Sequence, residues 1–199
     1  MPEFAIYPSL KGRSVFVSGG GSGIGASIVE HLAAQGAKVA FVDINEPASK
    51  EVAAKTGALF LKCDIKDTKA YQAALAEVAG KQGAITVLVN NAAHDERHRL
   101  EDVTPEFWDD RIAVNLRHAF FAIQAVVPGM KKAGGGSIVN FSSISYHTMT
   151  ANLAVYQAAK AATIGMTRGL ARDLGGDKIR LNSITPGWIM TQRQIDKWL

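Results

Sequence analysis

The chain is poor in cysteine and has no long hydrophobic run. Its 199 residues include one cysteine, Cys63, so neither an internal disulfide nor a thiolate zinc cluster can form. The longest apolar stretch, 119–127, is interrupted by Gln124 and is far too short to span a bilayer. The first ten residues lack the basic and apolar regions of a secretory signal. We therefore expect a cytoplasmic protein without a membrane partner.

A strong charge of one sign is also missing. The 22 basic and 18 acidic residues leave a net charge of +4, and the basic residues are scattered among the acidic ones. Nucleic-acid-binding proteins usually concentrate lysine and arginine on one face, so we expect no nucleic-acid partner. With 47% hydrophobic and 20% charged residues, the composition excludes a disordered chain, a collagen-like repeat and a coiled coil. We expect one globular domain over 1–199 whose partner is a small-molecule substrate.

Short β-branched runs alternate with longer helical patterns along the chain. Each run is apolar on both faces, as strands of a parallel sheet covered by helices on both sides must be. The sequence therefore predicts an α/β fold, a doubly wound parallel sheet of the Rossmann type with helices on both faces. The expected strands cover 14–18, 38–43, 58–64, 86–90, 136–141 and 179–184.

The helical patterns have recognisable starts and stops. An apolar stripe with four-residue spacing begins at Ile24. Thr104 followed by Pro105 is typical of an N-cap and a first helical turn, and we expect that helix to continue towards Met130. A second long helix is expected over 153–174, where two glycines stop it.

A glycine-rich segment, 18–25, lies between the first expected strand and the first helix. Without Cβ atoms in the way, its backbone amides can approach a pyrophosphate at the positive end of the helix. The segment lacks the Gly-Lys-Ser/Thr sequence of a P-loop, which disfavours a nucleotide hydrolase. We predict that Gly19, Ser22, Gly23, Ile24 and Gly25 bind the phosphates of a dinucleotide.

Two acidic residues end the second and third expected strands. Asp43 is placed to accept hydrogen bonds from both hydroxyls of the adenosine ribose, and its charge would repel a 2′-phosphate. No arginine or lysine in the glycine segment or just after Asp43 would neutralise such a phosphate. Asp64, with Ile65 beside it, is placed to meet the adenine. The predicted cofactor is therefore NAD.

Tyr156 and Lys160 are four residues apart on one expected helix and so share a face. A phenol with a pKa near 10 is a poor base at neutral pH, but a lysine ammonium about 5 Å away stabilises the phenolate. Ser143, at the end of the fifth expected strand, can reach the same space. These residues together predict a general acid/base that interconverts a hydroxyl and a carbonyl group.

At this point the sequence resembles the short-chain dehydrogenase/reductase family, in motifs that span 12–191 in the family's order. The resemblance implies an NAD(P)-dependent oxidoreductase that transfers hydride between a substrate carbon and the nicotinamide ring. One departure is Ala93, where the family usually has glycine, and a methyl group is a small change there. The matching residues are Gly19, Gly23, Ile24 and Gly25; Asn90, Asn91 and Ala92; Asn115; Ser143, Tyr156 and Lys160; and Pro186 with Gly187.

The same resemblance implies roles for individual residues. Tyr156 would be the catalytic acid/base, Ser143 would position the substrate, and Lys160 would bind the nicotinamide ribose and lower the tyrosine pKa. Asn115 would hold a proton-relay water. Further cofactor contacts are implied for Asn90, Ala92, Pro186, Gly187, Ile189 and Thr191.

A narrower similarity, in 91–98, 115–118 and 143–147, is to bacterial aldose 1-dehydrogenases of this family, which act on pentoses such as xylose or arabinose. A polyhydroxylated substrate needs many hydrogen bonds. We predict substrate contacts from His94, Asp95, His147 and Ser143. His94 and His98 also have the spacing of a metal pair, but no third ligand stands beside them, so no metal is expected.

Other functions remain open beside an NAD-dependent sugar dehydrogenase. A 3-oxoacyl thioester reductase acting on an acyl carrier would use NADPH, and Asp43 argues against it. A non-catalytic dinucleotide-sensing module would not need the catalytic residues.

Long helices after Thr104 and Leu153 lead us to expect a homodimer or homotetramer. By resemblance, we also expect the chain to end before the rest of a substrate lid, a last helix and a seventh strand.

Overall fold

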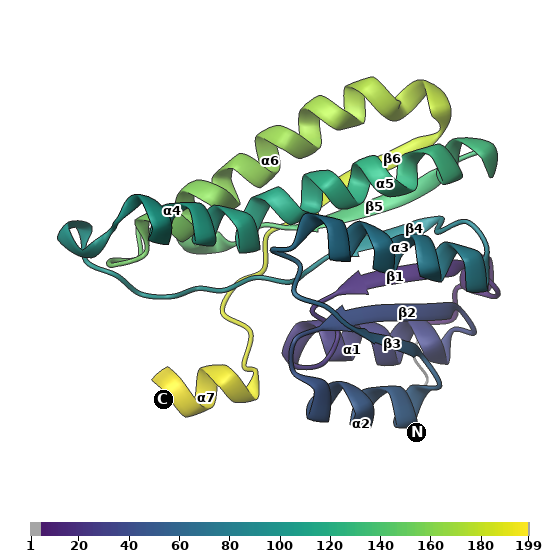
Figure 1. Ribbon diagram of the computed structural model, residues 1–199, viewed down its shortest axis with the longest axis horizontal. Helices are drawn as coiled ribbons and strands as arrows, with labels where there is room; N and C mark the ends of the chain where they lie inside the picture. Colours follow the sequence, from purple (N-terminus) through teal and green to yellow (C-terminus); the bar gives the residue numbers. More distant parts are fainter. Residues whose placement is uncertain (1–4, 199) are drawn as a thin grey trace.

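A parallel sheet of six strands forms the centre of the part of the chain that the computed structural model describes, residues 5–198. Its order is β3-β2-β1-β4-β5-β6, and every neighbouring pair runs parallel (Figure 1). The predicted doubly wound α/β fold is confirmed. The strands are β1 (Ser14–Ser18), β2 (Lys38–Asp43), β3 (Leu59–Lys62), β4 (Val87–Asn90), β5 (Gly136–Phe141) and β6 (Ile179–Ile184).

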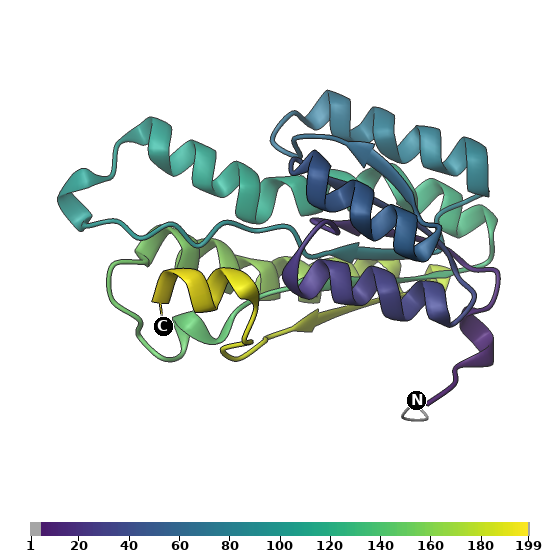
Figure 2. The ribbon, with the colours of Figure 1, turned by 90° about the horizontal axis from the view of Figure 1, so that it is seen from below.

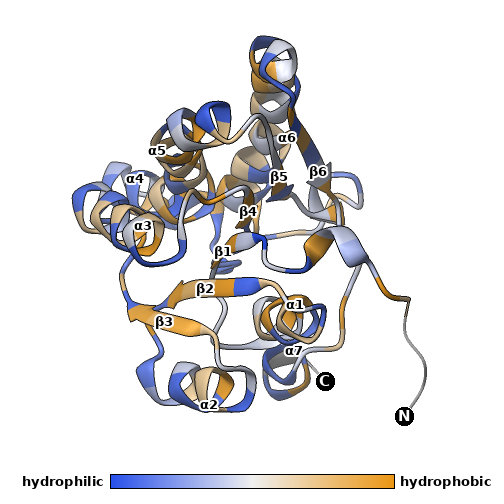
Figure 3. Cartoon of the chain, turned by 90° about the vertical axis from the view of Figure 1, so that its right-hand side faces the viewer, coloured by the Kyte–Doolittle hydropathy of each residue, from blue (hydrophilic) through white to orange (hydrophobic). Residues whose placement is uncertain are grey.

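Helices cover both faces of the sheet. The longer ones are α1 (Gly23–Ala34), α2 (Glu46–Thr56), α3 (Thr68–Gln82), α4 (Pro105–Ile112), α5 (His118–Lys132), α6 (Ala154–Leu174) and α7 (Gln192–Trp198). Helices α1 and α2 pack on one face, and α3, α5 and α6 pack on the other (Figure 3). In the central strand β1, Phe16 joins the core under α3 and α5, whereas Val15 and Val17 join the core under α1. All three side chains are fully buried, and the burial of each one stabilises the fold by about 1.5–3 kcal/mol.

The outer strands differ from the prediction that every strand is apolar on both faces. Strand β3 spans four residues rather than seven and is only partly buried. In β6, Ile179 and Leu181 are buried but Arg180 and Asn182 are exposed. Strand β6 is an edge of the described sheet, and α6 covers one of its faces, so its other face keeps polar residues.

The long helix expected from Thr104 to Met130 is interrupted. Thr104 does cap it, with its hydroxyl accepting a hydrogen bond from the amide of Phe107 at 3.2 Å. However, Ala113–Arg117 form a π-helical turn that separates α4 from α5. There the amide of His118 donates to the carbonyl of Ala113, five residues earlier instead of four. The prediction of one continuous helix was wrong at this turn.

The strand order reverses direction between β1 and β4, because the chain passes from β1 to one side of the sheet and later to the other. In such sheets the crevice at the carboxyl ends of the strands, next to the reversal, is where ligands bind. The segments after β1, β2, β4 and β5 all leave this edge of the sheet. The glycine loop and Ser143 lie in these segments, and Asp43 and Asn90 are the last residues of β2 and β4.

Candidate active site

The glycine loop has a shape that only glycine permits at two positions. A Cβ placed on Gly25 would stand 1.8 Å from the carbonyl oxygen of Gly19. Gly19 itself has φ +69° and lies against Ala92. Ser22 is the N-cap of α1, yet its hydroxyl makes no capping hydrogen bond. The first amides of α1 therefore remain available for a pyrophosphate, and the loop fits the predicted phosphate cradle.

Asp43 lies beside this loop at the end of β2. One carboxylate oxygen accepts a hydrogen bond from the amide of Gly21 and the other from the amide of Asn45, both at 2.9 Å. These two bonds fix the carboxylate while leaving each oxygen with further capacity to accept. A ribose diol could be held there.

The residues predicted near the adenine divide into one exposed and one buried residue. Asp64 is exposed, and one of its oxygens accepts from the amide of Lys66 at 2.9 Å. The side chain of Ile65 is buried in the core under α3 and α5. That side chain packs the fold, so only the backbone of Ile65 is left for a cofactor contact.

Asn90 forms part of a buried row of polar side chains between the sheet and α6. Its amide nitrogen donates to Asn140 at 2.8 Å, and Asn140 donates to Thr167 at 2.9 Å. The Oδ1 atom of Asn90 is buried and has no hydrogen-bond partner among the described residues. A contact between Asn90 and the ribose of a cofactor stays a prediction.

The segment after β4 is tied to the end of β1. The hydroxyl of Ser18 accepts hydrogen bonds from the amides of Asn91 and Ala92, both at 3.1 Å. The side chain of Asn91 donates to the carbonyls of Ser18 and Gly19, both at 3.0 Å. The Asn-Asn-Ala-Ala motif thus holds the glycine loop and the catalytic side of the crevice in a fixed relation.

Ser143, Tyr156 and Lys160 come together as predicted. A hydrogen bond from Ser143 lowers the pKa of the Tyr156 phenol, and the Nζ of Lys160 lies 5.6 Å from the centre of the Tyr156 ring. The ammonium of Lys160 also donates to the carbonyl of Phe141 at 2.8 Å, and the hydroxyl of Ser142 donates to the carbonyl of Lys160 at 2.7 Å. The end of β5 is therefore fastened to α6 at the predicted catalytic residues.

The pKa values of Tyr156 and Lys160 differ from those expected from the sequence. Burial raises the pKa of Tyr156 to about 12, and the hydrogen bond from Ser143 opposes the rise. Burial also lowers the pKa of Lys160 to about 8. Burial therefore dominates the pKa of Tyr156 in the protein alone, and a net lowering of this pKa by Lys160 is not seen in this state.

Asn115 lies in the π-helical turn, with its side chain occupied by protein backbone. Its Oδ1 accepts from the amide of His94 at 2.8 Å, and its Nδ2 donates to the carbonyls of His94 and Arg111 at 3.1 and 2.9 Å. The side chain therefore holds the loop after β4 and takes up a carbonyl of the interrupted helix. A relay water at Asn115 stays a prediction, and it would have to use the backbone of this residue.

The predicted substrate residues lie in different surroundings. Burial, with the nearby charge of Arg111, lowers the pKa of His94, whose Nδ1 contacts that arginine closely. Asp95 forms an ion pair with Arg193 at 2.6 Å. His147, by contrast, is exposed and stacks on Tyr146, with ring centres 3.9 Å apart.

Sequence reasoning missed Arg111 and Arg193. Arg111 contacts His94, which lies 17 residues earlier in the chain, and Arg193 contacts Asp95, which lies 98 residues earlier. Neither lies in a motif, so no local signal marks them.

The segment after β6 lies over the cofactor end of the site. The carbonyl of Pro186 accepts from the amide of Ile144, and the side chain of Thr191 approaches Gly23, within 3.3 Å of where a Cβ would stand. Gly187 and Ile189 are exposed on this segment. Figure 2 shows α7 continuing from it beside the extended loop after β4. Thr191 is thus close to the glycine loop, and its contact with the phosphates of a cofactor stays a prediction.

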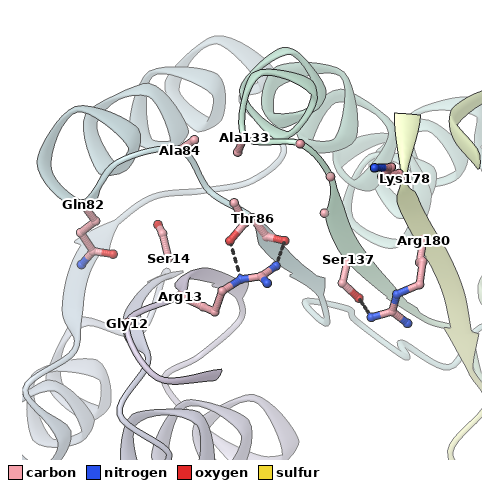
Figure 4. Close-up of a pocket in the computed structure, with 13 residues that line it drawn as sticks. Gly12, Arg13, Ser14, Gln82, Ala84, Thr86, Ala133, Ser137, Lys178 and Arg180 are labelled. Carbon is pink, nitrogen blue, oxygen red and sulfur yellow. Dashed lines mark hydrogen bonds between the residues drawn. The ribbon is translucent and has the colours of Figure 1, made fainter. Parts of the chain in front are cut away.

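A pocket of about 520 Å³ opens at the opposite edge of the sheet. Figure 4 shows Arg13 donating to Thr86, at 2.9 Å to the hydroxyl, and Arg180 donating to Ser137 at 3.2 Å. The lining includes the ends of α3 and α5, whose last carbonyls attract basic side chains. None of Ser143, Tyr156 and Lys160 lines this pocket.

The histidines of the loop after β4 do not form a metal site. Among the described residues, no group of three or more histidine, cysteine or acidic side chains is arranged to hold a metal ion. His98 instead accepts a hydrogen bond from the amide of Val155 in the first turn of α6, at 3.3 Å. Within the same part of the chain, no helix has the length and apolar character needed to cross a membrane.

The site combines a glycine loop at a helix N-terminus, a carboxylate beside it and a tyrosine–lysine pair at the end of β5. This arrangement suits hydride and proton transfer. Such a fold and site define a nicotinamide-dependent oxidoreductase. The model of the short chain dehydrogenase family matches residues 13–198, and the chain belongs to this family.

Individual relatives agree with this assignment. The chain is 49% identical to a D-xylose 1-dehydrogenase of Caulobacter vibrioides, over 98% of this chain and 78% of that protein. It is 51% identical to a "Probable galactose dehydrogenase" of Rhizobium meliloti, over 97% of this chain and 78% of that protein. A crystal structure from Sinorhizobium meliloti 1021, described as a "putative short-chain alcohol dehydrogenase", superposes with a TM-score of 0.85 at 34% identity, covering 91% of this chain and 74% of that one.

Proposed function

We propose that the protein is an NAD-dependent sugar dehydrogenase that oxidises a hydroxyl of an aldose. The observation that carries the proposal is the similarity, near 50% over almost the whole chain, to relatives named for xylose and galactose. The site supports the oxidation of a sugar, because the loop after β4, on the same edge of the sheet as Tyr156 and Ser143, is rich in polar side chains.

The chemical step falls to Tyr156. Ser143 donates a hydrogen bond to the substrate oxygen and orients it, and the phenolate of Tyr156 accepts the hydroxyl proton as the C–H bond breaks. A bound nicotinamide supplies the acceptor for the hydride, so the substrate loses one proton and one hydride and becomes a carbonyl compound. Lys160 holds a positive charge beside the phenolate and is placed to bind the nicotinamide ribose.

Asp43 supports NAD rather than NADP as the cofactor. Its carboxylate is fixed by the amides of Gly21 and Asn45, at the position where the adenosine ribose would lie. A 2′-phosphate there would meet a carboxylate that cannot turn away, and like charges at close range repel. Sequence positions 18–25 and 43–45 contain no basic residue to offset this repulsion.

The test is a substrate panel with both cofactors. Purified protein is assayed with D-xylose, L-arabinose, D-galactose and a 3-oxoacyl thioester, each with the NAD and the NADP couple. We expect oxidation of at least one aldose, with higher kcat/KM for NAD. Activity only on the thioester with NADPH would contradict both parts of the proposal. Dinucleotide binding without turnover on any substrate would favour a sensing module.

A further inference from the structure

We propose that Asp95 and Arg193 form a clamp for the substrate, which binds the hydroxyl group on the carbon next to the reacting one. The inference rests on the proposed oxidation of a sugar and goes further by assigning the group that recognises it. The clamp would make the enzyme selective for polyhydroxylated substrates over alcohols with a single hydroxyl.

The two residues meet across the entrance to the site. An oxygen of Asp95 lies 2.6 Å from the Nη2 of Arg193, although 98 residues separate them in the chain. Asp95 belongs to the loop after β4, and Arg193 lies in the first turn of α7. Among the hydrogen bonds of the described residues, this one joins α7 to the loop, whereas Gln192 and Gln194 bond to Asp196 and Trp188 nearby. The pair therefore bridges the two sides of the crevice.

The carboxylate is held in place by its own loop. Asn115 binds both the amide and the carbonyl of His94, the residue before Asp95, at 2.8 and 3.1 Å. The side chain of Asp95 is only 22% exposed, compared with 42% for Arg193. Asp95 is thus a fixed, partly desolvated acceptor, and Arg193 approaches it from the solvent side.

The pair lies at the same edge of the sheet as the reacting group. Asp95 follows β4, Ser143 follows β5 and Arg193 follows β6, and the carboxyl ends of these neighbouring parallel strands meet at one edge. In keeping with this placement, the negative charge of Asp95 raises the pKa of Tyr156 and the positive charge of Arg193 lowers it. A substrate whose reacting hydroxyl is at Tyr156 would place its neighbouring hydroxyl towards these two side chains.

A sugar hydroxyl suits the space between the two charges. It donates its hydrogen to the carboxylate and accepts from the guanidinium, so one group can replace the direct ion pair without leaving either charge unpaired. An alcohol without a second hydroxyl cannot do this, and it leaves the charges to pair with each other in a partly desolvated site. Sites built to hydrogen-bond a hydroxyl discriminate strongly against analogues that lack it.

The test compares each sugar with its analogue lacking that hydroxyl. D-Xylose and D-galactose are assayed beside their 2-deoxy forms, using wild type, Asp95→Asn, Arg193→Gln and the exchange Asp95→Arg with Arg193→Asp. We expect wild type to prefer the parent sugars in kcat/KM, and Asp95→Asn to lose roughly ten- to a hundredfold of that preference, mainly through KM. The exchange variant can re-form an ion pair, yet we expect it not to recover the preference.

Control variants distinguish a substrate clamp from a purely structural ion pair. Asp196→Asn changes an exposed carboxylate of α7 and should leave the preference unchanged. NAD affinity, measured by titration calorimetry, should be unaffected in every variant and shows that each one is folded. A preference that survives Asp95→Asn, or returns in the exchange variant, overturns the clamp and identifies the pair as a simple link between α7 and the loop. Wild type that oxidises neither sugar overturns the proposed function and the clamp together.

Discussion

The ammonium of Lys160 and the ring of Tyr156 lie one helical turn apart on α6, with 5.6 Å between the Nζ and the ring centre. Lys160 is almost completely buried, and its ammonium donates a hydrogen bond to the carbonyl of Phe141. The positive charge is therefore held near the phenol by the end of β5.

Tyr156→Phe removes the proton acceptor and keeps the ring. General acid/base groups contribute about 10²–10⁴ in rate, so we expect turnover on an aldose to fall by at least that factor. NAD affinity should change little, because the ring packing is retained. Steady-state kinetics and titration calorimetry measure the two quantities, and wild-type turnover in this variant would show that the acid/base assignment is wrong.

The oxidation rate should rise with pH. Because burial raises the pKa of Tyr156 to about 12, the phenolate fraction increases about tenfold per pH unit throughout the neutral range. Above the pKa of Lys160, about 8, the lysine loses its proton and no longer stabilises the phenolate, so the rise should flatten there. A profile of kcat/KM from pH 6 to 10 at constant ionic strength measures this. Oxidation that slows between pH 6 and 8 would contradict it.

Gly25→Ala should abolish dinucleotide binding. The new methyl group would stand 1.8 Å from the carbonyl oxygen of Gly19, so the loop must move away from the position that a pyrophosphate requires. Gly169→Ala is the matched control, because Gly169 lies inside α6 with no atom within 4 Å of its Cβ position. There alanine should raise stability by up to about 1 kcal/mol through its higher helix propensity. Calorimetric NAD titrations and thermal unfolding distinguish the two, and equal effects would contradict this account.

His118→Phe should make stability less dependent on acid. Burial lowers the pKa of His118 to about 3, below its value near 6.5 in an unfolded chain. Below pH 6.5 the unfolded state therefore binds a proton that the folded state does not, and stability is lost as the pH falls towards 3. The melting temperature should drop less between pH 7 and 5 in the variant than in wild type. His147→Phe, at an exposed histidine, should behave like wild type.

Two exposed aromatic residues mark the surface that we expect to pair in an oligomer. Trp108 on α4 is 44% exposed and Phe120 on α5 is 42% exposed. Large apolar side chains on one exposed surface favour association between copies. Light scattering should show a dimer or tetramer, and Phe120→Glu should shift it towards the monomer. A monomer in wild type would contradict this expectation.

The strands and the motif residues could be predicted because their signals are local. Strands β1, β2, β5 and β6 begin and end at the predicted residues, since apolar runs there are bounded by glycine or polar residues. The carboxyl ends of parallel strands meet at one edge, so the motifs after them had to come together.

Other features depend on contacts between distant parts of the chain. The pKa of Tyr156 is set mainly by burial, which follows from packing and not from the four-residue spacing to Lys160. The partner of Asp95 comes from α7, in a segment with no motif of its own. The polar row of Asn90, Asn140 and Thr167 likewise joins two strands and a helix.

The π-helical turn at 113–117 acts as a one-residue insertion into an otherwise regular helix. Each residue of an α-helix turns the chain by about 100°, so α5 is rotated by about that angle from where a continuous helix would place it. The side of α5 on which a residue lies therefore cannot be calculated from Trp108 on α4 by assuming one regular helix. Phe120 is exposed, although a regular helix would place it on a different side from the one it occupies. Deleting one residue here would restore the regular spacing and carry the side chain of Asn115, with its hold on the loop bearing Asp95, away from the crevice.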